Sequence, residues 1–312
     1  MAQAQSTIQT PSDLAVNIKS FGRHLRASNH SPRTVKSYLE ACQQFAAFIL
    51  AKRMPATVAG VRREHVEAFI QDQLDRLSPA SAAVRHRSLV QFWKWLVDEG
   101  EIKESPMARM RPPKVEEKLT PILTLQEIKR LFDACSGKDF EARRDLALIR
   151  VFISTMARRA EVAGLRTSDD PAVNDIDLDT GQARIHGKGA RQRLVPLDTK
   201  TTMALDRYIR ARMAHPEAAS EWLWLGRKGR LTEDGIRQAI ERRAAIAGIE
   251  NLHPHMFRHS AAHFWLASGG GELDLQRIAG WRDPQMLRRY GASLGQERAL
   301  QAAKTVGLGN LV

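Results

Sequence analysis

The segment HPHMFRHS, residues 253–260, concentrates three histidines and one arginine within eight residues. Histidine exchanges protons near neutral pH, and the planar arginine fork matches the oxygens of a phosphate. Such a cluster suits metal binding, phosphoryl chemistry or a purely structural role. On a helix that begins near Pro254, His255 and Arg258 are three residues apart and share a face, whereas His259 lies on another part of the surface.

Nothing else in the sequence favours a metal or a nucleotide for this segment. The chain has no HExxH motif, and its two cysteines, Cys42 and Cys135, have no metal-binding spacing. A GxxxxGK[ST] phosphate loop and an acidic metal cluster are also absent from the sequence. We therefore expect no metal and no cofactor, and we interpret His259 as mainly structural.

A second candidate for chemistry is Tyr290, in the segment LQRIAGWRDPQMLRRYGAS. It is one of three tyrosines. Tyr38 lies on an apolar helix face and Tyr208 in an ordinary helix, so packing explains both. Tyr290 follows Arg288 and Arg289 in a polar, basic stretch, where burial in a core is a poor explanation.

The chain resembles the tyrosine recombinases, also called the phage integrase family, over nearly its whole length, and five motifs in order carry the resemblance. STMARRAEVAGL is similar to the segment of their first catalytic arginine, HGKGARQRLVPL to their β-turn lysine segment, and PHMFRHS to their HxxR motif. AGW falls where the family usually has Leu-Gly-His, and tryptophan is an accepted alternative there. A tyrosine follows nine residues later, in the place of the nucleophile. The resemblance implies the catalytic residues Arg158, Lys188, His255, Arg258, Trp281 and Tyr290, supported by Glu161.

Two departures from the family pattern accompany the first arginine. Met156 and Ala157 stand where the family often has glycine and leucine. Arg159 adjoins Arg158, so the assignment depends on the step of three residues to Glu161.

The residue types suit cleavage of a DNA phosphodiester. Tyr290 can attack phosphorus to give a phosphotyrosyl link, and nearby positive charge favours its phenolate. Arg158 and Arg258 suit the two nonbridging oxygens. Trp281 can only donate a hydrogen bond, which leaves His255 as the proton carrier at neutral pH.

The residue types alone do not decide the roles of Lys188 and Glu161. The resemblance implies that Lys188 protonates the leaving 5′ oxygen, while the sequence alone indicates a basic turn. Glu161 is expected to orient Arg158 or a histidine, with a surface carboxylate as the alternative.

The first hundred residues predict helices. Ser31-Pro32 and Ser78-Pro79 are helix-start signals, and Gly100 is a stop signal. A third helix is expected over residues 62–74. Apolar residues at helical spacing mark one face of each of the two proline-started helices: Tyr38, Cys42, Phe45 and Ile49, and Leu89, Phe92, Trp93 and Leu96.

This helical bundle resembles the family's core-binding domain. Its basic side chains are candidates to lie against DNA phosphates, with a solvated surface as the alternative: Arg33, Lys36, Arg62, Arg63, Arg85, Arg87 and Lys94.

The segment ESPMARMRPPKVEEKLTPIL predicts an interdomain linker because it holds four prolines and mixed charge. We expect a core-binding domain over residues 1–112, a linker over 113–120 with the boundary near Val115, and a catalytic domain with a C-terminal tail over 121–312. Thr124 and Glu127 fit a capping box at the start of a helix.

The second domain is expected to be mostly helical, with one exception. VNDIDLDTGQARIHGKGARQRLVPL alternates apolar and polar residues in three runs, which predicts a three-stranded antiparallel meander with Lys188 at a glycine-flanked turn. Helices are expected over residues 202–213 and 232–247. The fold class is therefore mainly α with a small antiparallel sheet (α+β), which by resemblance is a helical core-binding bundle followed by an integrase-type catalytic domain.

Composition indicates a polyanionic partner. The chain has 48 basic and 35 acidic residues, a net charge of +13, and both predicted domains are net basic. The N-terminus lacks the features of a signal peptide, and no apolar run approaches a membrane span. With only two cysteines, a disulfide framework is not expected, so we expect a cytoplasmic protein on the bacterial nucleoid or, if phage-encoded, in the host cytoplasm.

The resemblance implies site-specific recombination by a homotetramer on two double-stranded DNA sites. An accessory or directionality protein is a possible further partner. The alternatives are relaxation of supercoils by a type IB topoisomerase and DNA binding without catalysis. The family also implies that the tail after Tyr290 docks in a neighbouring protomer, with folding back on its own domain as the alternative.

Overall fold

The computed structural model describes residues 13–116, 121–187, 191–281 and 287. Lys188, Tyr290 and the C-terminal tail thus lie outside the described residues. The chain divides into two compact units, Met1–Lys118 and Leu119–Val312. No helix in the described parts is long and apolar enough to cross a membrane.

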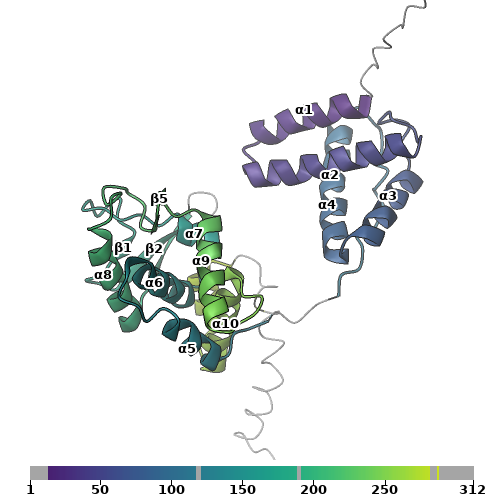
Figure 1. Ribbon diagram of the computed structural model, residues 1–312. Coiled ribbons are helices and arrows are strands. Elements are labelled where there is room, and N and C mark those ends of the chain that lie inside the picture. The colour runs from purple at the N-terminus through teal and green to yellow at the C-terminus, as the bar shows by residue number, and fades with distance from the viewer. Residues whose placement is uncertain (1–12, 117–120, 188–190, 282–286, 288–312) are drawn as a thin grey trace, which may run out of the picture. The chain divides into compact units, whose positions relative to one another are not determined.

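The N-terminal unit is a helical bundle (Figure 1). Its described helices are α1 (Asp13–Ala27), α2 (Pro32–Ala51), α3 (Arg63–Arg76) and α4 (Pro79–Asp98). The predicted starts of α2 and α4 are confirmed, because the hydroxyl of Ser31 accepts from Thr34 N at 3.2 Å and that of Ser78 from Ser81 N at 3.3 Å. Gly100, with φ of 78°, follows the end of α4 in the left-handed conformation that glycine adopts without strain.

The predicted apolar faces form the core of this unit. All the predicted face residues are buried except Tyr38, which is partly buried at the edge of the core. We did not predict α1, although Leu14, Ile18, Phe21 and Leu25 recur at helical spacing and are all buried.

The C-terminal unit is built around α6 (Phe140–Thr155), which contacts α8 (Thr199–Arg212), α9 (Glu233–Ile246) and α10 (Pro254–Ala267) (Figure 1). Three shorter helices complete the described part: α5 (Leu125–Asp133), α7 (Arg159–Ala163) and α11 (Glu272–Ala279). The capping box of α5 is confirmed, since Thr124 Oγ1 accepts from Glu127 N and Glu127 Oε2 accepts from Thr124 N.

The predicted meander is also confirmed. Strands β1 (Ile176–Asp177), β2 (Gln182–Gly187) and β3 (Arg191–Pro196) pair antiparallel in that order. A second, two-stranded sheet of β4 (Leu225–Gly226) and β5 (Gly229–Arg230) was not predicted. These strands are too short for a period of two to be visible in the sequence.

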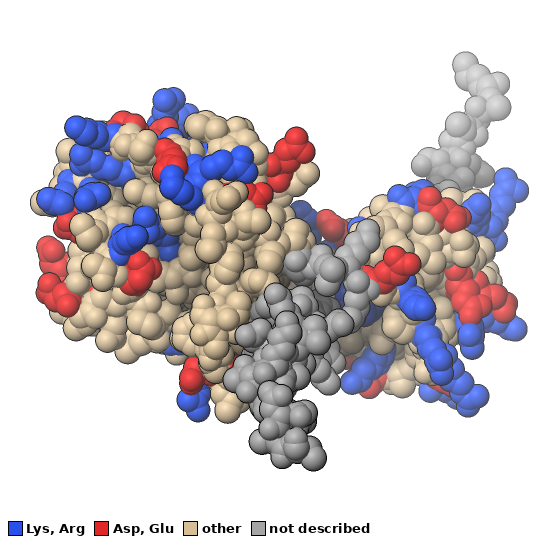
Figure 2. Space-filling view, turned by 90° about the horizontal axis from the view of Figure 1, so that it is seen from below, with Lys and Arg blue, Asp and Glu red and all other residues tan. Residues whose placement is uncertain are grey.

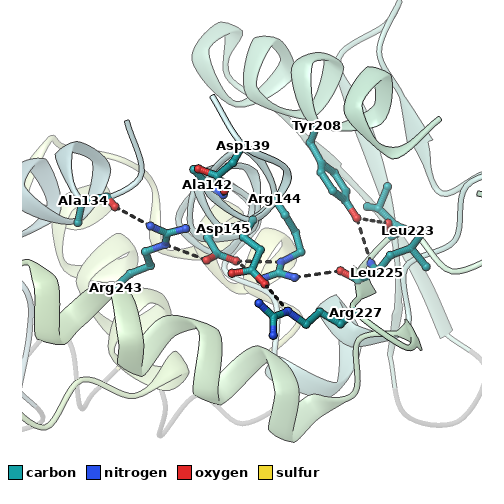
Figure 3. Close-up of polar contacts among 11 residues, drawn as sticks. Ala134, Asp139, Ala142, Arg144, Asp145, Tyr208, Leu223, Leu225, Arg227 and Arg243 are labelled. Atoms are coloured by element: carbon teal, nitrogen blue, oxygen red, sulfur yellow. Dashed lines mark hydrogen bonds and ion pairs between the residues drawn. The ribbon is translucent and has the colours of Figure 1, made fainter. Parts of the chain in front are cut away.

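A buried ion network fixes the N-terminal half of α6 (Figure 3). One oxygen of the Asp145 carboxylate, Oδ1, accepts from Arg144 Nε at 2.9 Å and Nη2 at 2.8 Å, and the other, Oδ2, accepts from Arg243 Nε on α9 at 2.8 Å. Arg144 Nη1 donates to Leu225 O in β4, and Arg243 Nη1 donates to Ala134 O after α5. This network therefore ties α6 to the elements around it.

Removing the Asp145 charge is expected to destabilise the C-terminal unit by about 3–5 kcal/mol, because two guanidinium groups would lose their buried counter-charge. The carboxylate is only 2% exposed, so water cannot replace it. The measurement is Asp145→Asn in the full chain, followed by hydrogen exchange of α6 peptides in urea. The matched control is Asp133→Asn, which breaks an exposed pair with Lys129 and should change stability by about 1 kcal/mol or less. Equal effects of the two substitutions would contradict a stabilising role for the network.

Candidate active site

A cavity of about 1050 Å³ in the C-terminal unit collects side chains from α7, β2, β3, α10 and the end of α11. Five of the residues predicted from the sequence line it: Arg158, Glu161, His255, Arg258 and Trp281. Its other ionisable lining residues were not predicted as site residues: His186, Arg191, Arg193, His259 and Arg277. Its charged side chains are therefore mostly cationic, with five arginines and one glutamate.

The turn after α6 sets the position of Arg158. Met156 has φ of 51° and ψ of 24°, a left-handed conformation that glycine adopts readily and other residues adopt at a cost. This explains why the family often has glycine at this position. The Met156 side chain is buried in a small apolar cluster that includes Trp281, so packing offsets part of the backbone cost.

Glu161 holds Arg158 in place. Its carboxylate accepts from Arg158 N at 2.9 Å and from Arg158 Nη1 at 2.9 Å. Burial raises the pKa of Glu161, but hydrogen bonds from Arg193 and Arg158 outweigh it and lower the pKa below its usual value. Because Glu161 is buried and charged, the alternative of a surface carboxylate is wrong.

Arg258 is buried beneath the cavity. Its Nη1 donates to Met156 O at 2.5 Å, and its Cζ lies 5.2 Å from the centre of the Trp281 ring. Among the described residues, its Nη2 has no hydrogen-bond partner. Burial, together with the charges of Arg158 and Arg193, lowers the pKa of Arg258 to about 9, although Glu161 opposes the shift. A buried guanidinium with a free donor is suited to bind an anion.

His255 lies one helical turn before Arg258, at the open side of the same cavity. Desolvation, followed by the charges of Arg258, His253, Arg159 and Arg158, lowers the pKa of His255 below 6.5. The imidazole is therefore neutral at pH 7 and able to accept a proton.

Trp281 follows the left-handed Gly280, which ends α11 with φ of 64°. The indole is buried in an apolar cluster with Met156, Ala262, Leu266 and Leu275. The ring thus forms a fixed wall beside Arg258.

Arg193 on β3 is the main contact residue of the site that was not predicted. Its Nη2 donates to Glu161 Oε2 at 2.8 Å, and its Nε donates to Ile278 O at 2.8 Å. No sequence signal separates it from Arg191, two residues earlier on the same strand. A second contact that was not predicted joins His186 Nε2 to the buried Asp175 at 2.6 Å.

Of the other two tyrosines, Tyr208 is unsuited to be a nucleophile. It is buried, its hydroxyl donates to Leu223 O at 2.9 Å and accepts from Leu225 N at 3.0 Å, and burial raises its pKa to about 12 (Figure 3). Tyr38 packs at the edge of the core of the N-terminal unit.

The candidate DNA-binding residues of the N-terminal unit are exposed, apart from the partly buried Arg85. Arg63, Arg85 and Arg87 line three grooves, and those of Arg63 and Arg87 share His86 and Met110. Arg63 also pairs with Glu67 at 2.7 Å. On the face of the molecule in Figure 2, acidic side chains lie among the basic ones. The role of these candidates in DNA binding therefore stays a prediction.

Two family models match the chain. That of the phage integrase family matches residues 121–297, and that of the phage integrase N-terminal SAM-like domain matches residues 18–102.

Curated relatives are similar over most of their length. The tyrosine recombinase XerC of Azotobacter vinelandii is 32% identical over 72% of this chain and 70% of that protein. The tyrosine recombinase XerC of Chromobacterium violaceum is 31% identical over 88% of this chain and 89% of that protein.

Solved structures share the fold. XerH site-specific recombinase bound to a palindromic difH substrate, in a post-cleavage complex, superposes with a TM-score of 0.71 at 19% identity, over 92% of this chain and 83% of that one. A lambda integrase dimer bound to a COC′ core site gives a TM-score of 0.70 at 14% identity, over 88% and 94% of the two chains.

Proposed function

Since the chain belongs to the phage integrase family of tyrosine recombinases, we propose that it cuts and rejoins DNA at specific sites through a 3′-phosphotyrosyl intermediate. The observation that supports this most is the single cavity lined by Arg158, His255, Arg258 and Trp281. These side chains supply anchors for a phosphate and a neutral base, which this reaction needs next to its nucleophile.

In the proposed first step, the phenol oxygen of Tyr290 attacks phosphorus and the bond from phosphorus to the 5′ oxygen breaks. His255 takes the phenol proton, and Lys188 gives a proton to the leaving oxygen. Arg158 and Arg258 hold the two nonbridging oxygens, where negative charge builds up in the transition state. In the second step, the 5′ hydroxyl of another strand attacks the phosphotyrosine, which rejoins DNA and frees Tyr290.

We also propose that the active assembly is a homotetramer on two duplexes. A solved structure of lambda integrase is a tetramer bound to a Holliday junction, and it shares this fold with a TM-score of 0.67. The candidate basic residues of the N-terminal unit, from Arg33 to Lys94, are proposed to contact DNA phosphates. We propose that the core-binding domain ends at residue 112 and that the catalytic domain begins at residue 121.

A nicked suicide substrate tests the central proposal. Loss of a short fragment after cleavage prevents rejoining, so a recombinase accumulates as a covalent DNA adduct that survives denaturing electrophoresis. Candidate target sites come from DNA recovered covalently bound to the protein from cells. A protein that only binds DNA yields no adduct on any site, and efficient relaxation of plasmids that lack the site would instead support a topoisomerase.

The pH dependence of adduct formation should follow His255. At subsaturating DNA the rate reports the free protein, in which the His255 pKa lies below 6.5. The rate is therefore expected to vary little near neutral pH and to fall on the acid side, as the imidazole becomes protonated, with a midpoint below the ordinary pKa of histidine. The measurement is the rate from pH 5 to pH 8, roughly the range in which histidine titrates. His255→Gln should lack this acid limb, and the same limb in that variant would assign it to another group.

Lys188→Ala should be rescued by sulfur in place of the 5′ leaving oxygen. A thiolate leaves without an acid, so a residue that acts only as that acid becomes dispensable. The expected result is slow cleavage of the ordinary substrate and nearly wild-type cleavage of the sulfur substrate. If the variant is equally slow on both, Lys188 anchors the phosphate instead.

A further inference from the structure

Arg193 joins two parts of the site that are far apart in sequence. From β3, its Nη2 reaches Glu161 on α7 at 2.8 Å and its Nε reaches Ile278 O on α11 at 2.8 Å. The same guanidinium lies against Gly280, where a Cβ atom would come within 3.0 Å of Nη1 and 3.1 Å of Cζ. One side chain thus contacts both α7 and the end of α11.

Each contact leads directly to a proposed catalytic group. Glu161 accepts two hydrogen bonds from Arg158, and Ile278 lies three residues before Trp281. The amides of Gly280 and Trp281 donate to Arg277 O and Gln276 O at 3.2 and 3.0 Å, which closes the end of α11. A shift of Arg193 would therefore move the supports of Arg158 and Trp281 together.

The two arginines on Glu161 differ in exposure. The Arg193 side chain is 15% exposed, whereas that of Arg158 is 45% exposed. The partners of a buried ion pair have no water to replace one another, whereas an exposed side chain can leave its ion pair for another partner at little cost. Arg193 is thus the fixed counter-charge of Glu161, so Arg158 can turn one edge of its fork to a phosphate without leaving a buried carboxylate unpaired.

We propose that Arg193 is a positioning residue that sets Arg158 and Trp281 about the reacting phosphate. This inference rests on the proposed function. A direct phosphate contact is a weaker explanation, because two edges of the Arg193 fork are already bonded and Nη1 faces Gly280. An effect of positive charge alone is also a weaker explanation. The contacts with Glu161 and Ile278 O use two different donors of the planar guanidinium, which a compact ammonium does not offer in that geometry.

Single-turnover cleavage of the suicide substrate is the main test. At saturating DNA, Arg193→Gln is expected to form adduct about 100-fold more slowly than wild type, the loss that a small misplacement of reacting groups causes. DNA affinity should stay within about threefold, because phosphate contacts elsewhere carry binding. Arg193→Lys should remain slow, since the ammonium keeps the charge but not the fork.

The matched control is Arg184→Gln on the neighbouring strand. Arg184 also donates to backbone carbonyls, to Ala172 O at 3.0 Å and Pro171 O at 3.4 Å, but it does not line the cavity. It should cleave at the wild-type rate. A wild-type rate for Arg193→Lys would show that the charge of Arg193 suffices, and would overturn a role for its two contacts with Glu161 and Ile278 O. If Arg193→Gln lost as much DNA affinity as cleavage rate, Arg193 would be a DNA contact instead.

The sulfur substrate separates an effect of Arg193 on Arg158 and Trp281 from an effect on Lys188. If Arg193 acts on Arg158 and Trp281, the Arg193→Gln defect should persist when the leaving atom is sulfur. Full rescue would mean that Arg193 acts by placing Lys188, which would overturn the proposal.

Hydrogen exchange tests, without any cleavage, whether Arg193 holds the end of α11 through its contact with Ile278 O. In Arg193→Gln the amides of Gly280 and Trp281 should exchange faster than in wild type, while exchange in α6 stays unchanged. Unaltered exchange at these two amides would overturn the proposal that Arg193 positions Trp281. Failure of the proposed function is recognised separately, because the wild-type protein would then form no adduct at all.

Discussion

Tyr290→Phe is expected to bind its DNA site as tightly as wild type and to form no covalent complex with it. The substitution removes one oxygen atom, the proposed nucleophile, and keeps the ring. Of the other tyrosines, Tyr208 is buried with its hydroxyl bonded to Leu223 O and Leu225 N, and Tyr38 is partly buried at the edge of the core of the N-terminal unit. Neither is suited to replace Tyr290, so the expected loss of adduct is complete.

Band shifts on an intact site measure affinity, and denaturing gels of the suicide substrate measure the adduct. Tyr38→Phe is the matched control, because it removes the same atom from the N-terminal unit and should leave adduct formation unchanged. Residual adduct in Tyr290→Phe would assign the nucleophile to another residue, which mass spectrometry of the linked peptide would identify.

Arg258→Ala is expected to slow cleavage by about 1000-fold, with little loss of DNA affinity. A preorganised donor to a developing oxyanion contributes about 10²–10³ in rate. Arg258 adds a full charge to its Nη2 donor, which has no partner among the described residues. The fold should tolerate the change because the buried guanidinium is costly to desolvate, as its lowered pKa indicates.

Arg258→Lys distinguishes the fork from the charge. An ammonium cannot reproduce two donors in one plane, so the lysine variant should remain slow. Thermal melting of each variant checks that the C-terminal unit is folded. A folded Arg258→Ala that cleaves within about tenfold of wild type would remove Arg258 from the transition state.

Local signals explain the parts of the fold that could be predicted. The helices that begin after Ser31, Ser78 and Thr124 have caps within three residues, so their starts depend on neighbours in sequence. The meander is equally local, because each of its strands pairs with the next one along the chain. Of the site, the sequence indicated five residues that line one cavity.

The parts that were missed depend on contacts between distant segments. The alternation of β3 cannot reveal that Arg193 meets Glu161 and Ile278, which are 32 and 85 residues away. Nor does the sequence show that Arg144 and Asp145 are buried, since charged residues usually face solvent. The left-handed backbone of Met156 is also invisible, because methionine is not a residue typical of that conformation.

The charges around the cavity link DNA binding to the stability of the fold. Arg158, Arg193 and Arg258 surround a single carboxylate, and their mutual repulsion contributes to the low pKa of Arg258. The folded protein without DNA therefore carries an electrostatic strain that a phosphate would relieve. Any ligand that binds only the folded state shifts the unfolding equilibrium toward it. If the chain acts on DNA as proposed, the C-terminal unit is expected to resist heat and proteases best while it holds its DNA site.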